Sequence, residues 1–402
     1  MTEQAISPQE KIPFARTCPF SPPAEYQRML AEEPVARVRL LNNDEVWALT
    51  SYADVRAMFT DARFSSDNRH PGYPTFTPEK PTEQPVRTIV NLDAPEHNEA
   101  RRRVIGEYTA KRIKDLRPQV QLIVDKHLDA LLDGPKPVDL VAALAVPVPA
   151  LVMCEQLGVP LDDHQFFLSI NTKLVSIASS ESERDEAFSA LGGYLWALIE
   201  KKENNPGDDL LSRQIAKNRE CGDYDRMSLL GLAFLLLVAG HENLVGMIAL
   251  GTALLLQHPE QRARFTADPS LTPGMVEEML RYFTVADLAA VRVATEDVKI
   301  GSKIIRAGEG VVALINAANH DPDVFPEPNE FDINRRPSHP HLALGFGPHL
   351  CLGQSLARME LEVVFDTLFA RIPGLKLAVP VEELKFKGEE GTYGLYELPV
   401  SW

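Results

Sequence analysis

The sequence predicts a mainly α-helical protein with small β-sheets. Apolar residues recur at helical spacing along much of its 402 residues, and strand-like alternation is confined to short pieces. Apolar residues make up 45% of the chain and charged residues 24%, proportions that argue against a disordered chain, a fibre or an integral membrane protein. Since neither an internal repeat nor a linker divides the sequence, we expect one domain spanning residues 1–402.

The longest apolar segment, residues 228–257, is the expected central helix. It is long enough to span a bilayer, but His241, Glu242 and Asn243 lie in its middle, where lipid would make their burial costly. A helix that is apolar on all sides also fits the centre of a large soluble core, which about 45 Å of helix would cross. The polar triplet then either has structural partners or faces a ligand cavity.

The remaining elements follow from spacing and stop signals. Further helices are expected over residues 100–131, 188–202, 273–283 and 354–372. Strands are expected over residues 36–40, 46–49, 290–294, 299–305 and 311–315. Five prolines in residues 71–85 exclude a regular helix or a central strand, and leave either a lid or a surface excursion.

Charge and cysteine usage exclude several classes of protein. Lys and Arg number 41 and Asp and Glu 57, which gives a net charge of −16 and disfavours nucleic-acid binding. The four cysteines, Cys18, Cys154, Cys221 and Cys351, form no C-x-x-C pair and indicate a reducing compartment. The first twenty residues lack the pattern of a signal peptide. We therefore expect a cytoplasmic protein that does not associate with a membrane.

The most informative segment is LGFGPHLCLG, residues 344–353, which directly precedes an expected helix. Its three glycines predict a fixed loop with unusual backbone angles. Cys351 faces the start of the helix, where N–H groups and the helix dipole favour a thiolate. A lone thiolate suits an axial metal ligand, haem iron among them, or a nucleophile. The alternatives are a buried inert cysteine and a zinc site that adds His339, His341 and His349.

The same loop resembles the haem-binding signature of the cytochrome P450 superfamily, F-x-x-G-x-x-x-C-x-G, in its soluble actinobacterial form. Gly347, Cys351 and Gly353 match, whereas Leu344 stands where the family usually has Phe. In the family that Phe packs near the thiolate, so the departure bears on the iron's potential and not on ligation. The resemblance covers nearly the whole chain. It implies the single-domain P450 fold, with the long helix over haem b and Cys351 as the iron's axial ligand.

Further motifs follow in the family's order. Glu278 and Arg281 match the Glu-x-x-Arg helix, and the family's third member of this buried ion network corresponds to Arg335. By the same resemblance, two haem propionates would be neutralised through charge-assisted hydrogen bonds. The residues at the corresponding positions are His97, Arg101, Arg292 and His349.

The central helix carries Ala239-Gly240-His241-Glu242-Asn243, which aligns with the family's oxygen-activation segment, Ala-Gly-x-Glu/Asp-Thr. There Gly240 leaves room for dioxygen and Glu242 helps to deliver protons. Asn243 stands in place of the usual Thr, and three hypotheses follow. The amide supports ordinary oxygen activation, aided by a substrate hydroxyl or water; or it marks altered chemistry such as nitration, oxidative coupling or nitric-oxide reduction; or it is a packing substitution with poor coupling.

The resemblance implies a monooxygenase that oxidises a small, largely apolar molecule, a natural product of secondary metabolism, as a monomer. The chain has no flavin, nicotinamide or iron–sulfur motif, so a ferredoxin and its reductase would supply electrons. A basic strip, Arg101, Arg102, Arg103, Lys111, Arg112 and Lys114, is the candidate docking face or else a solvated helix face. The distal pocket would be lined by residues 90–92, 170–177, 238–240, 288–291 and 392–393. The competing class is a non-enzymatic haem sensor.

Overall fold

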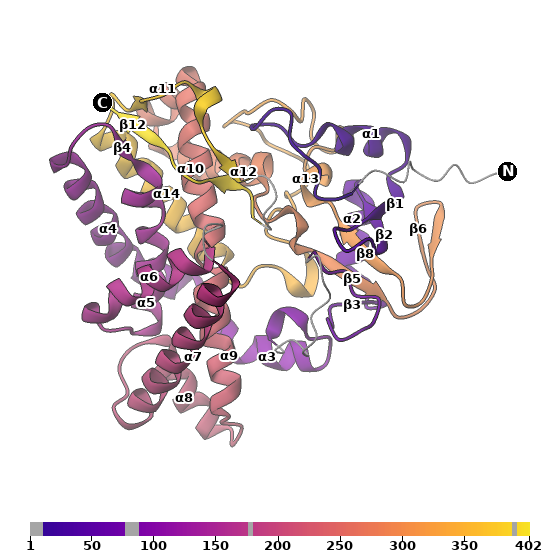
Figure 1. Cartoon of the computed structure of the whole chain (residues 1–402), viewed down its shortest axis with the longest axis horizontal. Coiled ribbons are helices and arrows are strands. Elements are labelled where there is room, and N and C mark those ends of the chain that lie inside the picture. The colour runs from indigo at the N-terminus through magenta and orange to yellow at the C-terminus, as the bar shows by residue number, and fades with distance from the viewer. Residues whose placement is uncertain (1–10, 77–87, 176–179, 388–391) are drawn as a thin grey trace.

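The structure, a computed structural model, describes residues 11–76, 88–175, 180–387 and 392–402. It confirms a mainly helical fold with small sheets, and most of the long helices lie on one side of the molecule and the largest sheet on the other (Figure 1). The helices are α1 (Ala24–Glu32), α2 (Tyr52–Thr60), α3 (Glu96–Val104), α4 (Ala110–Asp133), α5 (Pro147–Leu157), α6 (His164–Val175), α7 (Glu181–Asn204), α8 (Leu210–Glu220), α9 (Arg226–Ala239), α10 (Glu242–Gln257), α11 (Pro259–Ala267), α12 (Thr272–Phe283), α13 (Ile315–Ala318) and α14 (Gln354–Arg371).

The strands are short and form four separate sheets in the described part of the chain. They are β1 (Val35–Arg39), β2 (Glu45–Leu49), β3 (Phe64–Ser65), β4 (Val138–Asp139), β5 (Val291–Ala294), β6 (Val298–Ile300), β7 (Lys303–Ile305), β8 (Gly310–Ala313), β9 (Lys376–Leu377), β10 (Phe386–Lys387), β11 (Gly394–Leu395) and β12 (Pro399–Ser401). The largest sheet has the order β1-β2-β8-β5-β3, in which β2 and β8 are parallel and the other pairs antiparallel. Its strand β5 is buried throughout and carries Arg292 into the interior.

The central apolar segment folds as two helices and not as the single helix expected. α9 ends at Ala239 and α10 begins at Glu242, so Gly240 and His241 form a break between them. A Cβ on Gly240 would lie 2.7 Å from the carbonyl oxygen of Leu236, which explains why glycine stands there. The apolar segment is long enough to cross a membrane, but it serves here as the core helix of the fold.

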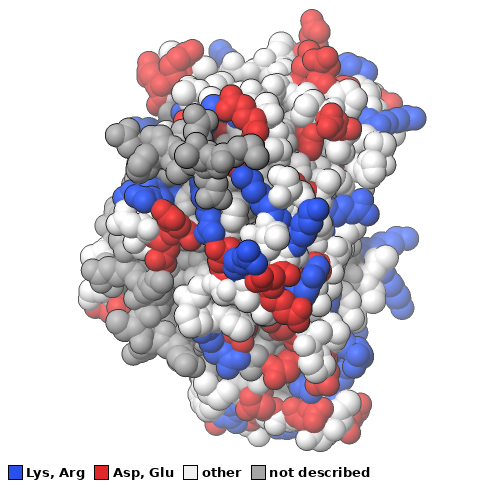
Figure 2. Space-filling model, turned by 90° about the vertical axis from the view of Figure 1, so that its right-hand side faces the viewer, with Lys and Arg blue, Asp and Glu red and all other residues white. Residues whose placement is uncertain are grey.

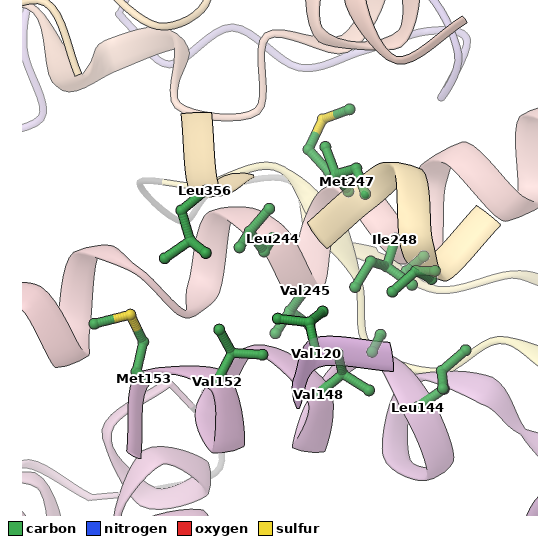
Figure 3. Close-up of a cluster of buried hydrophobic side chains, with 14 of the residues drawn as sticks. Val120, Leu144, Val148, Val152, Met153, Leu244, Val245, Met247, Ile248 and Leu356 are labelled. Carbon is green, nitrogen blue, oxygen red and sulfur yellow. The ribbon is translucent and has the colours of Figure 1, made fainter. Parts of the chain in front are cut away.

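The core around α10 is built by α5 and α14. Val148 and Val152 of α5 lie opposite Val245 of α10, and Leu356 of α14 lies near Leu244 (Figure 3). All five side chains are buried, and each such burial contributes about 1.5–3 kcal/mol. Because Leu356 follows the cysteine loop closely in the sequence, this packing fixes the loop relative to the helix break.

Two other expected elements are subdivided in the structure. The stretch 100–131 forms the end of α3, a 3-10 turn (Ile105–Tyr108) and most of α4, since Thr109 begins a new helix by capping the N–H of Arg112. The strand expected at 299–305 is the antiparallel pair β6 and β7, joined through Gly301 at φ +53°. Of the proline-rich segment 71–85, residues 77–85 lie outside the described residues. Its first part is anchored, because the Thr75 hydroxyl accepts a hydrogen bond from Asn42.

Charges of both signs are mixed on the described surface of the sheet side. Lys and Arg side chains alternate with Asp and Glu side chains over that face (Figure 2). Such mixing is what a soluble globular surface shows, and it offers nucleic acid no extended basic face there.

Candidate active site

The cysteine loop owes its shape to two glycines. Gly345 and Gly347 have φ angles of +75° and +69°, a region that other residues adopt at a cost. A Cβ on Gly347 would lie 2.8 Å from the carbonyl oxygen of Phe59, so α2 also restricts that position. The Cys351 N–H closes the loop by donating to the carbonyl oxygen of Leu344 at 2.8 Å. The loop thereby holds Cys351 just before the N-terminus of α14.

The surroundings of Cys351 act on its charge in opposite directions. Burial raises the pKa of the thiol, while the Gly353 N–H and the cations Arg101 and Arg358 lower it. Burial is the largest effect, so the helix terminus alone does not produce the thiolate that the sequence led us to expect. A coordinated metal ion deprotonates a thiol outright, so a metal ligand role remains compatible with this burial.

Four nitrogen-bearing side chains predicted as propionate partners come together beside the loop. They are His97 and Arg101 from α3, Arg292 from β5 and His349 from the loop itself. The imidazole rings of His97 and His349 lie 4.0 Å apart between centroids, and Arg101 donates to the carbonyl oxygen of Leu350 at 2.7 Å. Segments separated by up to 252 positions thus meet at one place, since residues 97 and 349 are 349 − 97 = 252 apart.

Arg292 is the most informative of the four. It is 7% exposed, and burial lowers the pKa of its guanidinium. Its hydrogen bond runs to the carbonyl oxygen of Val291 at 2.7 Å, and within the described residues no carboxylate forms an ion pair with it. A buried, unneutralised guanidinium is costly, and it fits a site completed by an anionic group. A haem propionate has this chemistry, so the residues present fit the cofactor.

His97 and His349 are also affected by burial next to cations. Burial lowers the pKa of His349 to about 3, with Arg292, His97 and Arg101 adding to the effect. Burial also lowers the pKa of His97. Both rings are therefore neutral near pH 7 in this cationic surrounding. The Nε2 atom of His349 lies 3.1 Å from the Ser66 hydroxyl, a partner that no motif indicates.

The zinc site considered from the sequence is wrong. The described residues contain no group of His, Cys, Asp and Glu side chains able to hold a metal ion together. His339 lies against Tyr52, His341 is 3.3 Å from Glu277, and His349 stacks on His97. These histidines are close in sequence, but the loop directs them to different neighbours.

The break between α9 and α10 places the predicted oxygen-handling residues next to an exposed end of α9. Val238 is 40% exposed and Ala239 is exposed as well, while the following helix is buried. Gly240, Glu242 and Asn243 are half-buried. Val238 and Ala239 therefore present apolar atoms that the protein does not cover, which fits contact with an apolar ligand.

Asn243 has only part of its hydrogen-bonding capacity satisfied. Its Nδ2 donates to the carbonyl oxygen of Ala239 at 3.4 Å, a long bond. Its Oδ1 is buried and has no partner among the described residues. The side chain thus offers an acceptor at the break, where the family's Thr would offer a hydroxyl.

His241 and Glu242 have their own partners. The His241 imidazole is 1% exposed and its Nε2 lies 3.0 Å from the carbonyl oxygen of Val146, next to α5. Burial lowers its pKa to about 4, so the ring is neutral and donates through Nε2. The Glu242 carboxylate lies 3.7 Å from the ammonium of Lys387, a residue that the sequence analysis did not single out.

The Glu-x-x-Arg network has the geometry expected. Arg281 donates to both carboxylate oxygens of Glu278, at 2.7 and 2.8 Å, and Arg335 donates to the same two oxygens at 3.0 Å. Glu278 and Arg281 are each 2% exposed at their side chains. Arg281 also donates to the carbonyl oxygens of Asn319 and Pro328, so the network fastens α12 to the segment before the cysteine loop.

The expected pocket segments are only partly accessible. Val90 is 55% exposed, whereas Ile170, Val291 and Tyr393 are buried. Residues 176 and 177 lie outside the described residues. A further neighbour of Arg292 is Tyr73, whose hydroxyl is neutral because burial raises its pKa.

The basic strip divides into separate parts. Arg101 points to the cysteine loop, Arg103 pairs with Asp223 at 3.1 Å and Arg112 lies 3.7 Å from Glu107. The remaining members, Arg102, Lys111 and Lys114, are exposed. The positive face is thus smaller than the sequence indicated.

Known proteins match this chain along its whole length. The family description "Cytochrome P450" matches residues 177–372. Cytochrome P450 GfsF of Streptomyces halstedii is 43% identical over 96% of this chain and 94% of its own. Pentalenic acid synthase of Streptomyces avermitilis is 43% identical over the full length of both. The crystal structure of cytochrome P450 MoxA from Nonomuraea recticatena (CYP105) is 50% identical, superposes with a TM-score of 0.93 and covers 98% of both chains.

These relatives decide between the enzyme and the sensor. Named P450 enzymes match the whole chain, so the expectation of a non-enzymatic haem sensor is wrong. P450 enzymes use a haem-iron cofactor, act on small molecules and take electrons from redox partners. The chain belongs to the cytochrome P450 family and is a haem-iron monooxygenase.

Proposed function

We propose that this enzyme hydroxylates or otherwise tailors a small, largely apolar natural product, using dioxygen and electrons from a ferredoxin and its reductase. The cofactor is haem b, with Cys351 as axial ligand of the iron. We place the reaction in the cytoplasm and the enzyme in the monomeric state. The observation that carries the proposal is the buried guanidinium of Arg292, which has no carboxylate partner in the described residues and lies with the other three predicted propionate partners beside a lone cysteine.

Each residue of the site has a task in this proposal. Arg101, Arg292, His97 and His349 hold the two propionates, and Arg292 gains in this way the anion that its buried guanidinium lacks. When bound, the haem supplies the oxidising chemistry, and thiolate ligation favours O–O cleavage.

The residues at the helix break act on the other side of the site. Gly240 lets the helices bend apart where Met153 and the Leu236 carbonyl oxygen leave no space for a side chain, and by the family resemblance this is the place where dioxygen is accommodated. Glu242 passes a proton toward the break, and Asn243 offers its unpaired Oδ1 to a hydroxyl of substrate or water. Val238 and Ala239 present apolar surface to the substrate.

The substrate class rests on the relatives and on the apolar lining. Pentalenic acid synthase, and the Vitamin D3 dihydroxylase of Streptomyces griseolus at 42% identity, are named for bulky, mostly apolar molecules. A CYP105P1 structure holds filipin I and is 43% identical. We therefore propose a molecule of this size with one or more hydroxyl groups, which the acceptor on Asn243 favours.

The first experiment is the absorption spectrum of the dithionite-reduced protein with carbon monoxide. A strongly red-shifted Soret band is expected for thiolate-bound haem, and Cys351→His should move the band to the position of histidine-ligated haem. Cys221→Ser is the matched control, because Cys221 is exposed and far from the loop in sequence. Folded wild-type protein that binds no haem would overturn the proposal.

Electron delivery is tested on the basic strip, at the exposed Arg102 and Lys111 and at the half-buried Arg103. Charge reversal at Arg102, Arg103 and Lys111 should slow reduction by an acidic ferredoxin, and more at low ionic strength, since steering charges are screened by salt. Lys299→Glu, an exposed change on β6, is the control. An unchanged reduction rate in the triple variant would place the docking site elsewhere.

A second candidate function follows from Asn243. Its unpaired acceptor, in place of a hydroxyl, favours a reaction with altered proton delivery, such as nitration, oxidative coupling or nitric-oxide reduction. Asn243→Thr separates the two candidates. If Asn243 supports ordinary oxygen activation, the variant keeps the product and changes the peroxide released per electron. If it marks altered chemistry, the product itself changes. An unchanged product and an unchanged peroxide yield would leave Asn243 without a role in either.

A further inference from the structure

The C-terminal strand pair, β10 and β11, packs on the face of α10 that carries Glu242. Lys387 on β10 lies opposite Gly394 on β11. A Cβ on Gly394 would be 3.4 Å from the Cα of Gly246, and Gly246 follows Glu242 by one helical turn, on the same face. The two glycines allow the backbones to approach closely. This approach brings the long side chain of Lys387 to the start of α10.

The contact between Lys387 and Glu242 is shielded from solvent. Its nitrogen and oxygen are 3.7 Å apart, and the side chains are 10% and 29% exposed. The ammonium also lies 5.7 Å from the centre of the Tyr396 ring. Ion pairs on an open surface contribute little, but a shielded ammonium acts strongly on the charges near it. The charge of Lys387 is felt at the helix break itself, where it is one cause of the lowered pKa of His241.

We propose that Lys387 is a positioning residue for Glu242, whose side chain it holds in place at the helix break so that protons are delivered there in step with electrons. The inference rests on the role proposed above for Glu242. It makes the C-terminal strand pair part of the proton supply, although no motif in that part of the sequence indicates one.

The strand pair contains its own control. Lys385 lies two residues before Lys387 and pairs with Glu397 at 2.9 Å. Its side chain is 71% exposed and that of Glu397 is 45% exposed. Removing this ion pair changes the charge of the same strand pair by the same amount, but on the solvent side. A difference between the two lysines therefore reports on the position of the charge and not on the integrity of the strand pair.

The experiment needs no identified substrate. The haem-loaded enzyme oxidises NADPH through a surrogate ferredoxin and its reductase, and the share of dioxygen released as hydrogen peroxide is measured. Water formation consumes more protons per dioxygen than peroxide release, so a disturbed proton supply raises the peroxide share. We expect Lys387→Gln to raise the ratio of peroxide to water at least about threefold, a small part of what a positioned acid contributes. Lys385→Gln should leave the ratio unchanged, and Lys387→Arg should restore most of it.

The double variant with Glu242→Gln distinguishes the possible failures. If Glu242→Gln alone leaves the ratio unchanged, the proposed role of Glu242 is wrong. If Glu242→Gln raises the ratio and Lys387→Gln does not, the present inference is wrong while the proposed function stands. If Lys387→Gln raises the ratio further by the same factor in the Glu242→Gln protein, Lys387 acts independently of Glu242, and the inference is again overturned. An effect of Lys387→Gln that disappears in the Glu242→Gln protein supports it.

A readout separate from turnover checks the charge itself. The carbon monoxide stretching frequency of the reduced, carbon monoxide-bound protein responds to nearby charges. We expect it to shift in Lys387→Gln and to stay in place in Lys385→Gln. The thermal midpoint of each variant, measured in parallel, shows whether the fold is retained, and Lys387→Arg provides the test if Lys387→Gln does not fold. A peroxide share and a stretching frequency that are both unchanged in Lys387→Arg and Lys387→Gln would overturn the proposal.

Discussion

The cysteine loop and the helix break serve the same site but are constructed differently. The loop owes its shape to backbone features: positive φ angles at Gly345 and Gly347, and hydrogen bonds between main-chain atoms. The break differs in its side chains: two buried polar atoms there, Nδ1 of His241 and Oδ1 of Asn243, have no partner among the described residues. The backbone conformation thus sets the shape of the loop. At the break, by contrast, two side-chain atoms remain able to form hydrogen bonds with a substrate or water.

On the side of the cysteine loop, the largest loss of stability is expected from Glu278→Gln. The change leaves Arg281 and Arg335 buried or half-buried without their carboxylate, and removing one partner of a buried ion pair typically costs about 3–5 kcal/mol. Denaturant unfolding should show this loss. Glu45→Gln, which removes the exposed pair with Arg39, should cost at most about 1 kcal/mol. Equal losses in the two variants would mean that the network does not stabilise the segment before the loop.

On the side of the helix break, His241→Gln should alter the dependence of stability on pH. Burial lowers the pKa of His241 from 6.5 to about 4 in the folded chain, so the unfolded chain binds the extra proton in this window. Wild-type stability therefore falls as the pH drops from about 6.5 toward 4, by roughly 3 kcal/mol from this residue.

The variant should lack this part of the acid loss, which unfolding curves at a series of pH values would reveal. His320 and His349, whose pKa values burial lowers to about 3, titrate in both proteins and cancel in the comparison. His70→Gln, an exposed change, should leave the profile as it is. Parallel pH profiles for wild type and His241→Gln would show that the ring is not held neutral at the break.

The contrast between loop and break also explains what the sequence could predict. The loop could be recognised because Gly347, Cys351 and Gly353 match a short family signature, in which Gly347 has a positive φ that few other residues adopt. A local weakening of the helix at Gly240 could be expected from the glycine, but a division into two helices could not, because apolar residues continue through the break. Lys387 was missed for another reason: its partner is 145 positions away, 387 − 242, and only the fold brings them together.

The two glycines of the loop have similar φ angles but different neighbours. Gly347→Ala combines a positive φ with a Cβ 2.8 Å from the Phe59 carbonyl oxygen, so a loss of about 2–3 kcal/mol is expected. Gly345→Ala has a similar φ but no atom closer than 3.5 Å, and should cost only about 1 kcal/mol. Thermal unfolding of both haem-loaded variants measures the difference. If the two losses are equal, contact with α2 does not restrict the loop.

The last prediction concerns Arg292, where the requirements of the fold and those of the site conflict. Its buried guanidinium has no carboxylate partner in the described part of the chain, so it destabilises the haem-free protein. Arg292→Leu should therefore leave the haem-free protein as stable as wild type or make it more stable. The same change should weaken haem binding about tenfold to a hundredfold, because a charge-assisted hydrogen bond is worth roughly 1.5–3 kcal/mol.

Haem titration and denaturant unfolding of the haem-free protein measure the two effects separately. Arg306→Leu, which removes an exposed pair with Asp297, should change neither by much. A variant that is more stable without haem but binds haem more weakly would show that Arg292 is retained for its ligand. A haem-free protein that is destabilised while haem affinity is unchanged would instead make Arg292 a structural residue, and the cationic cluster would lose its meaning as a propionate site.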